Sequence, residues 1–300
     1  APTTVLAKQH FEVFKERFSE FPYRICLLTR EQTKTEKAEI YKKIKENHFS
    51  IIIGTHALFN KEISFKSLNL LIIDEEHKFG VRQKEQIRSL KNGINVISLS
   101  ATPIPRTLNL SLSKVRDISL ITTPPTGRKS VKTIVSRYSK SLVFEAIQRE
   151  FYRDGQVFYL LNNVSMLEEK KKEISDRFPD KTIAFAHGQL RPKELSKVMQ
   201  SFIRKEIDLL VCTTIIESGI DIENANTLIV EESENYGLSQ LHQIRGRVGR
   251  SKREAYAYFL LNENKELKNK ASERINALQE NESLLSGFSL AMRDLEIRGA

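Results

Sequence analysis

Disulfide-linked, metal-stabilised and membrane-spanning folds are all disfavoured by what this sequence has little of. It contains only two cysteines, Cys26 and Cys212, which lie far apart in apolar runs and predict buried thiols in a reducing compartment. Its six histidines have no metal-ligand spacing, so we predict no structural metal. No apolar run approaches the roughly 20 residues that span a bilayer, and the first residues show no signal-peptide pattern. A cytoplasmic protein is therefore expected.

The bulk composition predicts a two-domain globular protein with a polyanionic partner. A chain of 300 residues corresponds to about two domains of ordinary size, and 40% hydrophobic residues are enough to build their cores. The net charge of +10 favours binding to a polyanion. Charge alone does not choose between DNA, RNA and an acidic protein.

Strand and helix patterns alternate along most of the chain. Short runs rich in Ile, Leu and Val predict buried parallel strands at Arg24–Leu28, Ser50–Ile53, Leu70–Ile73, Asn95–Leu99, Val131–Ser136, Gln156–Leu161, Thr182–Ala186, Asp208–Cys212, Thr227–Glu231 and Ala255–Leu260. Charged periodic segments between them predict covering helices, among them Thr33–Asn47, Arg82–Lys91, Lys140–Arg153 and Arg191–Arg204. The two halves share this general pattern, and we expect no close repeat of sequence between them.

Two breaks divide this α/β pattern into tandem lobes and a tail. Two prolines and a glycine in Thr122–Lys129 predict a linker. From about Asn264 the pattern is purely helical, and Lys265–Gln279 and Ser283–Arg293 predict a helical hairpin. We therefore expect four segments: a first lobe over residues 1–122, a linker over 123–130, a second lobe over 131–262 and a helical element over 263–300.

A cluster of three arginines and two glycines lies near the end of the second lobe. On a continuous helix Gln243, Arg247 and Arg250 would share one face, because they are spaced by four and three residues. A glycine destabilises a helix by roughly 1 kcal/mol relative to alanine. Gly246 and Gly249 therefore indicate that a phosphate-bearing partner approaches closely. The alternative is a basic helix that binds nothing, or binds nucleic acid loosely.

An apolar strand that ends in carboxylates is the second strong signal, in Leu70-Leu-Ile-Ile-Asp-Glu-Glu-His77. Ligands of open α/β sheets bind beyond the carboxyl ends of the strands. An Asp at this point can hold Mg²⁺, directly or through water, and the next Glu can orient or deprotonate an attacking water. We assign Asp74 to the metal and Glu75 to the base. The alternative is a solvated acidic turn.

Two further strand ends carry hydroxyl groups. The hydroxyls and prolines that start at Ser100-Ala-Thr102 suit a loop linking two sites, or a plain exit from the strand. Thr213 and Thr214 can hold a phosphate at the end of a strand, and Asp221 can accept a hydrogen bond from a ribose hydroxyl. The alternative is an ordinary turn with Gly219 at a positive φ angle.

These segments stand in the order of the motifs of helicase superfamily 2. Asp74-Glu-Glu-His77 resembles motif II, and Ser100-Ala-Thr102 resembles motif III. Thr213–Asp221 resembles motif V, and Gln243-Ile-Arg-Gly-Arg-Val-Gly-Arg250 resembles motif VI. The resemblance covers essentially all 300 residues. Within the superfamily the sequence is most similar to the bacterial transcription-repair coupling factors (the Mfd family), and next to the RecG-type branched-DNA helicases. Three stretches favour the former family: Asp74–Glu85, Val115–Pro125 and Val211–Ile222.

The resemblance implies a fold and roles for individual residues. Two RecA-like lobes would close on ATP; Asp74 would hold Mg²⁺ through water and Glu75 would activate the attacking water. Arg247 and Arg250 would act as arginine fingers, and ATP binding would also use Gly219, Asp221 and Gln243. Coupling of ATP to DNA would involve His77, Ser100, Ala101, Thr102, Arg293 and Arg298. Contacts with the DNA backbone would come from Pro2, Thr3, Thr4, Gly54, Thr55, His56, Asn162, His187, Gly188, Thr213 and Thr214.

The sequence departs from the family at the phosphate-binding loop. No G-x-x-x-x-G-K-[ST] occurs, although the backbone N–H groups and the lysine of that loop hold the β- and γ-phosphates. The first residues already match the motif that follows this loop in the family. We therefore expect a first lobe that lacks a strand and a helix, and a tail element that is cut short. We interpret the chain as a fragment of a longer protein or the product of a truncated gene.

Three functions are open on this evidence. The first is the motor core of an ATP-dependent double-stranded DNA translocase that displaces stalled RNA polymerase and recruits nucleotide excision repair through modules absent from this chain. By itself the chain would be a monomer without ATPase activity, and the family implies a nucleoid-associated bacterial protein. The second function is a RecG-like branched-DNA helicase. The third is a non-catalytic DNA-binding fragment, which the net charge of +10 favours.

Overall fold

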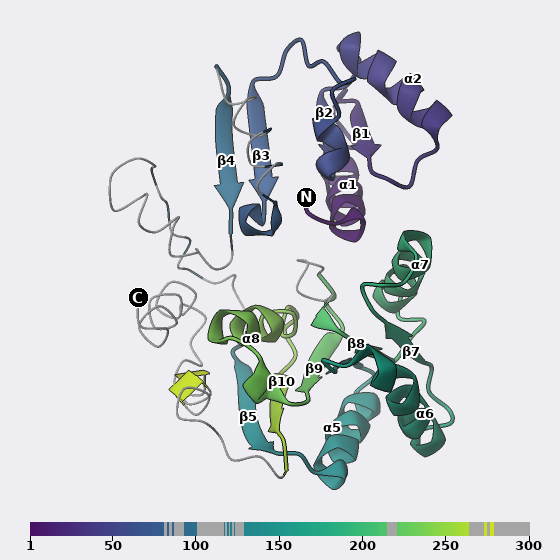
Figure 1. Cartoon of the computed structure of the whole chain (residues 1–300), viewed down its shortest axis with the longest axis vertical. Coiled ribbons are helices and arrows are strands. Elements are labelled where there is room, and N and C mark those ends of the chain that lie inside the picture. Colours follow the sequence, from purple (N-terminus) through teal and green to yellow (C-terminus); the bar gives the residue numbers. More distant parts are fainter. Residues whose placement is uncertain are drawn as a thin grey trace. The chain divides into compact units, whose positions relative to one another are not determined.

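The computed structural model describes residues 1–80, 83, 86, 93–100, 117, 119, 121, 123, 129–214, 221–263, 273, 274, 277 and 278. These residues divide into two units, one within residues 1–101 and the other within residues 102–300 (Figure 1). Both units are built from parallel strands with helical connections, as the alternating sequence pattern predicts.

The second unit contains a six-stranded sheet in the order β5-β10-β9-β6-β8-β7, in which every pair of neighbours is parallel. Its strands are β5 (Val131–Arg137), β6 (Gln156–Leu160), β7 (Ile183–Ala186), β8 (Leu209–Cys212), β9 (Ala225–Val230) and β10 (Ala255–Leu261). Strands β6, β8 and β9 are buried at every position. Burial on both faces explains why their sequences are nearly continuous apolar runs.

Helices cover both faces of this sheet. They are α5 (Lys140–Tyr152), α6 (Leu167–Arg177), α7 (Pro192–Ile203) and α8 (Leu238–Arg245), with the 3₁₀ turns η3 (Val164–Met166) and η5 (Ser233–Asn235). On one face, Ile147 of α5 and Ile174 of α6 pack in a cluster with Val157 and other strand residues. On the other face, Phe202 of α7 is fully buried with its ring centroid 4.9 Å from that of Phe158. The core of the second unit is therefore filled on both sides.

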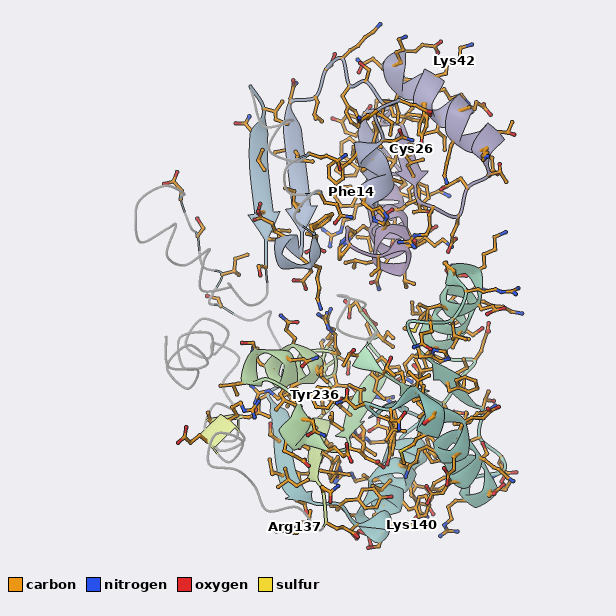
Figure 2. The ribbon with its side chains drawn as sticks, viewed as in Figure 1. Phe14, Cys26, Lys42, Arg137, Lys140 and Tyr236 are labelled. Atoms are coloured by element: carbon orange, nitrogen blue, oxygen red, sulfur yellow. The ribbon has the colours of Figure 1, made fainter. Side chains whose placement is uncertain are left out.

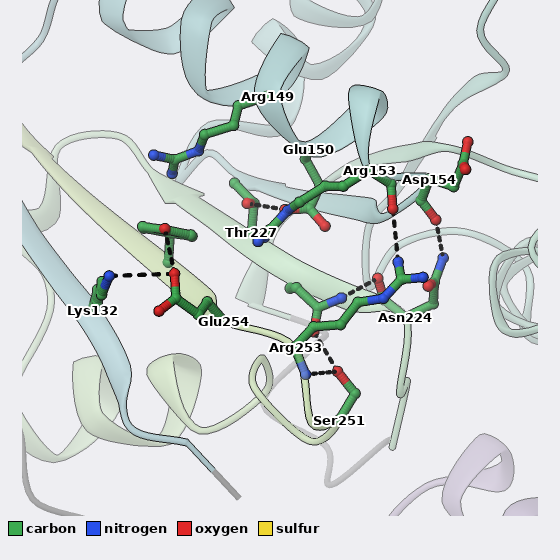
Figure 3. Close-up of polar contacts among 12 residues, drawn as sticks. Lys132, Arg149, Glu150, Arg153, Asp154, Asn224, Thr227, Ser251, Arg253 and Glu254 are labelled. Carbon is green, nitrogen blue, oxygen red and sulfur yellow. Dashed lines mark hydrogen bonds and ion pairs between the residues drawn. The ribbon is translucent and has the colours of Figure 1, made fainter.

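Polar side chains tie together the turns at the amino-terminal edge of this sheet (Figure 3). The carboxylate of Glu150, at the end of α5, is fully buried and accepts hydrogen bonds from Thr227 and from Arg153. Arg253, in the turn before β10, donates to the carbonyl of Arg153 at 2.7 Å. These bonds satisfy polar groups inside the fold and fix the turns that lead into β6 and β10.

The first unit contains two separate pairs of parallel strands in the part that the structure describes, β1-β2 and β3-β4. The strands are β1 (Ile25–Leu28), β2 (Ile51–Gly54), β3 (Leu70–Asp74) and β4 (Asn95–Leu99). The helices are α1 (Thr4–Arg17), α2 (Lys34–Lys45) and the 3₁₀ turns η1 (His56–Phe59) and η2 (Glu76–Lys78). Helix α2 begins with a capping box, in which the Thr33 side chain and backbone exchange hydrogen bonds with Glu36.

Strands β3 and β4 are not buried on both faces, so this part of the prediction is wrong. Ile73 is buried beside Phe79, and Leu71 and Val96 pack against them. The alternate side chains are each 46–49% exposed: Leu70, Ile72, Ile97 and Leu99. Successive side chains of a strand point to opposite faces. Among the described residues, packed side chains meet only one face of this pair.

The predicted strands agree with the observed strands to within two residues at each end, and so do the helices α2, α5 and α7. Cys26 and Cys212 are both buried and free, as predicted, and burial raises the pKa of the Cys26 thiol to about 11. Figure 2 shows Cys26 inside the first unit.

Other predictions fall largely outside the described residues. These are the linker, the helix at Arg82–Lys91 and the C-terminal hairpin. The proposed domain boundaries also stay predictions. Among the described helices, none has the length and apolar character needed to cross a membrane.

Candidate functional site

Asp74 and Glu75 lie where β3 ends and η2 begins. Glu75 has a left-handed backbone, with φ 53° and ψ 52°, and it is 6% exposed. Non-glycine residues adopt this conformation uncommonly, and such residues are concentrated at functional sites. The strand therefore ends in an acidic pair whose second member is buried by an unusual turn.

Asp74 is held as an ionised carboxylate. Its Oδ2 lies 2.9 Å from Nε2 of His10 on α1. That hydrogen bond lowers the pKa of Asp74 and outweighs the opposing effect of burial, and the charges of His10 and of the amino terminus lower it further. Mg²⁺ prefers oxygen ligands and is usually held by one or two carboxylates together with waters and substrate phosphates. Asp74 and Glu75 fit that requirement, although no group of three or more ligating side chains occurs among the described residues.

Gly54, Thr55 and His56 follow directly from β2. A Cβ on Gly54 would lie 2.3 Å from the carbonyl oxygen of Leu28, so only glycine fits between the ends of β1 and β2. Thr55 is 3% exposed and caps η1 with its side chain. Burial, together with the charge of Arg30, lowers the pKa of His56.

Pro2, Thr3 and Thr4 lead into α1, and Thr3 caps that helix by accepting a hydrogen bond from the N–H of Leu6. The amino group of Ala1 donates to the Gly54 carbonyl at 2.8 Å, and the same amino group affects the pKa of Asp74. The structure therefore brings the start of the chain, next to Pro2, against Gly54, so two of the predicted DNA-contact segments lie side by side.

The carboxyl ends of four neighbouring strands in the second unit are flush. Leu160 of β6 pairs with Cys212 of β8 and with Val230 of β9, and Ala186 of β7 also pairs with Cys212. The residues that follow these ends line one edge of the sheet. They include the remaining predicted DNA contacts: Asn162, His187, Gly188, Thr213 and Thr214.

The arginine-rich segment is not one continuous helix. Helix α8 ends at Arg245, and Gly246 is its C-cap. Gly249 has a φ of +74°, and a Cβ there would lie 2.8 Å from Cγ2 of Val131 in β5. Gly249 is therefore needed for the path of the chain past β5. The prediction of one helical face is wrong for Gln243, Arg247 and Arg250.

Arg250 and Asp221, two of the predicted nucleotide-site residues, form an ion pair. Nη1 of Arg250 lies 3.2 Å from Oδ1 of Asp221, and its Nε donates to the carbonyl of Gly246. Arg247 is 5% exposed, and Gln243 is half-buried in α8. Arg250 and Asp221 lie in the connections that lead into β10 and β9. They are thus separated from the predicted DNA contacts, which follow the opposite ends of the strands.

Arg245 is a residue that the sequence reasoning missed. It is 6% exposed, and it donates to Thr133 of β5, to the carbonyl of Leu278 at 3.0 Å and to Nδ1 of His242. Burial and the Arg245 charge lower the pKa of His242 to about 4, so this imidazole stays neutral and can accept. The signal was available, because Arg245 follows the buried Leu241 by four residues and so shares its face of α8.

Several predicted residues lie outside the described part of the chain: Ala101, Thr102, Gly219, Arg293 and Arg298. His77 lies in η2, and its side chain is also outside that part. Ser100 follows β4 directly and is exposed. The coupling roles assigned to these residues stay predictions.

Two protein-family models match the chain where the two lobes are expected. The DEAD/DEAH box helicase model matches residues 1–110, and the helicase conserved C-terminal domain model matches residues 140–252. The chain belongs to helicase superfamily 2. The predicted α/β class with two tandem RecA-like lobes is therefore confirmed.

Individual relatives confirm the narrower resemblance. The transcription-repair-coupling factor of Staphylococcus epidermidis is 52% identical over 299 residues, which cover 100% of this chain and 26% of that protein. The corresponding factor of Staphylococcus aureus is 51% identical with the same coverage. A structure of RecG bound to a three-way DNA junction superposes with a TM-score of 0.77 and 35% identity, over 99% of this chain and 39% of that one. The chain spans about a quarter of the length of these coupling factors.

Proposed function

We propose that this chain is the motor core of an ATP-dependent translocase on double-stranded DNA, and that the whole protein acts as a transcription-repair coupling factor. The observation that carries the proposal is the acidic turn at Asp74 and the buried Glu75, in a chain 52% identical to a transcription-repair-coupling factor. The RecG relative is 35% identical, so that alternative has less support.

In the first lobe, Asp74 would hold Mg²⁺, and Glu75 would orient the water that attacks the γ-phosphate and accept its proton. The metal supplies positive charge to the phosphates. The ionised state of Asp74 supports its role, since the hydrogen bond from His10 keeps the carboxylate deprotonated. The low exposure of Glu75 supports its role as a base, because a base works best when bulk water is excluded.

In the second lobe, Arg250 and Arg247 stabilise the charge that develops on the transferred phosphoryl group, and Asp221 contacts the ribose. The ion pair between Arg250 and Asp221 supports a shared place at the nucleotide. When Arg250 contacts a phosphate, its ion pair with Asp221 must either break or persist with both residues at the nucleotide. An arginine finger contributes about 10³–10⁵ in rate.

The proposed DNA track uses small and hydroxyl side chains that follow the carboxyl ends of the strands. They include Gly54 and Thr55 in the first lobe, and His187 and Thr213 in the second. Such groups suit contacts with backbone phosphates, which are the same at every base pair and so give no sequence specificity. That property is what a motor moving along any sequence needs. The net charge of +10 supports a polyanionic track.

By itself the chain does not hydrolyse ATP under this proposal, because its sequence contains no phosphate-binding loop. RNA polymerase and nucleotide excision repair proteins are partners of the whole protein, through regions other than these 300 residues. The protein then works as a monomer at the nucleoid of a bacterial cytoplasm.

A chimera tests the proposal. Residues 1–300 replace the matching 299-residue segment of the Staphylococcus epidermidis factor, whose remaining parts complete the molecule. The chimera is expected to hydrolyse ATP when double-stranded DNA is added, whereas the isolated chain is not. Arg250→Ala should lower kcat by about 10³ or more. Arg253→Ala is the matched control and should stay within about twofold, because Arg253 bonds to a carbonyl at the edge of the sheet.

A folded chimera that binds DNA but shows no DNA-stimulated turnover would contradict the proposal and favour a non-catalytic binding fragment. Wild-type turnover in Arg250→Ala would remove the arginine from the mechanism. The gene sequence that precedes the codon for Ala1 separates the two motor families: a polymerase-interaction module favours a coupling factor, and an OB-type wedge domain favours a RecG-type helicase.

A further inference from the structure

The turn after β9 repeats the acidic turn after β3. Residues 71–80 are Leu-Ile-Ile-Asp-Glu-Glu-His-Lys-Phe-Gly, and residues 228–237 are Leu-Ile-Val-Glu-Glu-Ser-Glu-Asn-Tyr-Gly. Four of the ten positions are identical, and three more exchange Ile for Val, Asp for Glu and Phe for Tyr. This match is confined to ten residues, so it does not contradict the expectation of no close repeat between the lobes. The repeat is short and partly conservative, so a comparison of whole lobes overlooks it.

The two turns also share their backbone conformation. Glu75 and the equivalent Glu232 are both left-handed, with φ of 53° and 48°. Each opens a three-residue 3₁₀ turn, and its carbonyl accepts a hydrogen bond from the N–H three residues later, at 2.8 and 3.0 Å. Each turn then leads to a buried aromatic ring, Phe79 or Tyr236. Figure 2 shows Tyr236 inside the second unit.

The two copies differ in what balances their negative charge. Glu231 stands at the position of Asp74, and Nζ of Lys170 on α6 lies 3.0 Å from its Oε1. The same Nζ lies 3.0 Å from Oε2 of Glu173 and donates to the hydroxyl of Tyr138 at 3.2 Å. The side chains of Lys170 and Glu231 are only 11% and 12% exposed. Glu231 is therefore neutralised from inside the fold.

The ammonium stays charged in this place. Burial alone would lower the pKa of Lys170, but the carboxylates of Glu231 and Glu173 outweigh burial and raise it. Burial and the charge of Glu231 also raise the pKa of Tyr159, whose hydroxyl donates to Glu231. Around Nζ stand two carboxylate oxygens and a hydroxyl, which are the hard oxygen ligands that Mg²⁺ and Ca²⁺ prefer.

We propose that the turn after β9 is a second copy of the acidic turn, in which the ammonium of Lys170 takes the place of a divalent cation. The internal cation closes this copy to metal and holds η5 and the start of α8 whether or not nucleotide is bound. Lys170 is thus a positioning residue for Glu231, which directly follows β9. The inference rests on the repeat and on the contacts of Lys170, and it does not depend on the proposed ATPase activity.

The test compares four forms of the 300-residue chain: wild type, Lys170→Met, Lys170→Arg, and Lys170→Met combined with Glu231→Gln. Thermal unfolding is followed by far-UV circular dichroism, in EDTA and in millimolar Mn²⁺. Lys170→Met leaves the carboxylate of Glu231 without its counter-charge, whereas Glu173 keeps its ion pair with Lys140, so the Tm should fall by about 5 °C or more in EDTA. Mn²⁺ should enter the vacated oxygen cluster and restore roughly half of that loss.

The other variants separate a cation site from general loss of packing. Lys170→Arg keeps the charge, and its Tm should stay within about 2 °C of wild type. The double variant replaces the ion pair by neutral groups, so it should regain most of the lost stability and ignore Mn²⁺. Adding Asp74→Asn to Lys170→Met must leave the rise of Tm in Mn²⁺ unchanged, because the ion is expected to bind at Glu231.

Three results would overturn the proposal. The first is a Lys170→Met variant with the wild-type Tm. The second is a destabilised Lys170→Met variant whose Tm does not rise in Mn²⁺, or a double variant whose Tm rises in Mn²⁺ as much as that of Lys170→Met. The third applies if Lys170→Met does not fold: the double variant must then still fold in EDTA, and its failure to do so counts against an internal cation.

Discussion

The two lobes carry the same strand and acidic turn in different surroundings. In the second lobe, β9 lies inside a six-stranded sheet and its turn is neutralised by the buried Lys170. In the first lobe, among the described residues, β3 pairs only with β4, half of its apolar side chains are exposed, and Asp74 contacts a partly exposed histidine. A filled sheet with an internal cation makes a rigid support. In the first lobe, the acidic pair is the one to which we assign a metal ion and a phosphate.

The largest expected difference between the lobes is in packing energy. Phe202→Ala removes a fully buried ring from the second lobe and should destabilise it by about 3–5 kcal/mol. Ile72→Thr replaces a side chain of the first lobe that is 49% exposed by a smaller, more polar one, and it should destabilise that lobe by less than about 1 kcal/mol. Urea denaturation followed by circular dichroism measures both, since the chain has no tryptophan. Equal losses would mean that the exposed face of β3 is in fact covered.

A smaller effect is expected where the chain passes from α8 to β10. Gly249→Ala places a Cβ against Val131 in a left-handed conformation and should destabilise the second lobe by about 1–3 kcal/mol. Gly246→Ala is the matched control: φ is −67° and the nearest atoms lie at 3.5 Å. It should be neutral or stabilise by up to about 1 kcal/mol. A Gly249→Ala variant as stable as Gly246→Ala in the same denaturation assay would refute the turn geometry.

The smallest effect concerns pH and the acidic turn of the first lobe. The pKa of Asp74 is lowered in the folded state, chiefly by the hydrogen bond from His10. Its contribution is therefore complete above the unfolded pKa of about 3.9 and is lost as pH falls through the folded value. We expect at most about 1 kcal/mol. Stability measured between neutral and acid pH should fall less steeply in His10→Ala than in wild type, and identical slopes would exclude the pairing.

Local pattern was enough to locate most elements of both lobes. The apolar runs at Gln156–Leu160 and Leu209–Cys212 are long enough and bounded clearly enough to define strands. The same reasoning overestimated the burial of Leu70–Asp74, because an apolar run does not reveal how many neighbours a strand has. It also extended α8 too far, because a glycine in a helical pattern does not reveal a positive φ such as that of Gly249.

The candidate site was less accessible to sequence reasoning. Asp74 and Glu75 follow an apolar strand and can be recognised by position alone. The partners of these and equivalent residues lie far away in sequence: His10 for Asp74, and Lys170 for Glu231. Long-range pairing depends on how the strands are ordered, which no local pattern contains. The repeat of the acidic turn gained meaning only when both copies showed the same left-handed backbone.

The most direct test of this account makes the same change at equivalent positions of the two copies. Glu75→Gln and Glu232→Gln are introduced separately into the chimera, and DNA-stimulated ATP hydrolysis is measured. Glu75 is buried and is the proposed base, so its loss should lower kcat by about 10² or more. Glu232 is exposed and bonds to Asn235, so its loss should change kcat by less than about twofold. Equal effects of the two variants, or wild-type turnover in Glu75→Gln, would contradict this account. It assigns ATP hydrolysis to the acidic turn after β3 and a structural role to the acidic turn after β9.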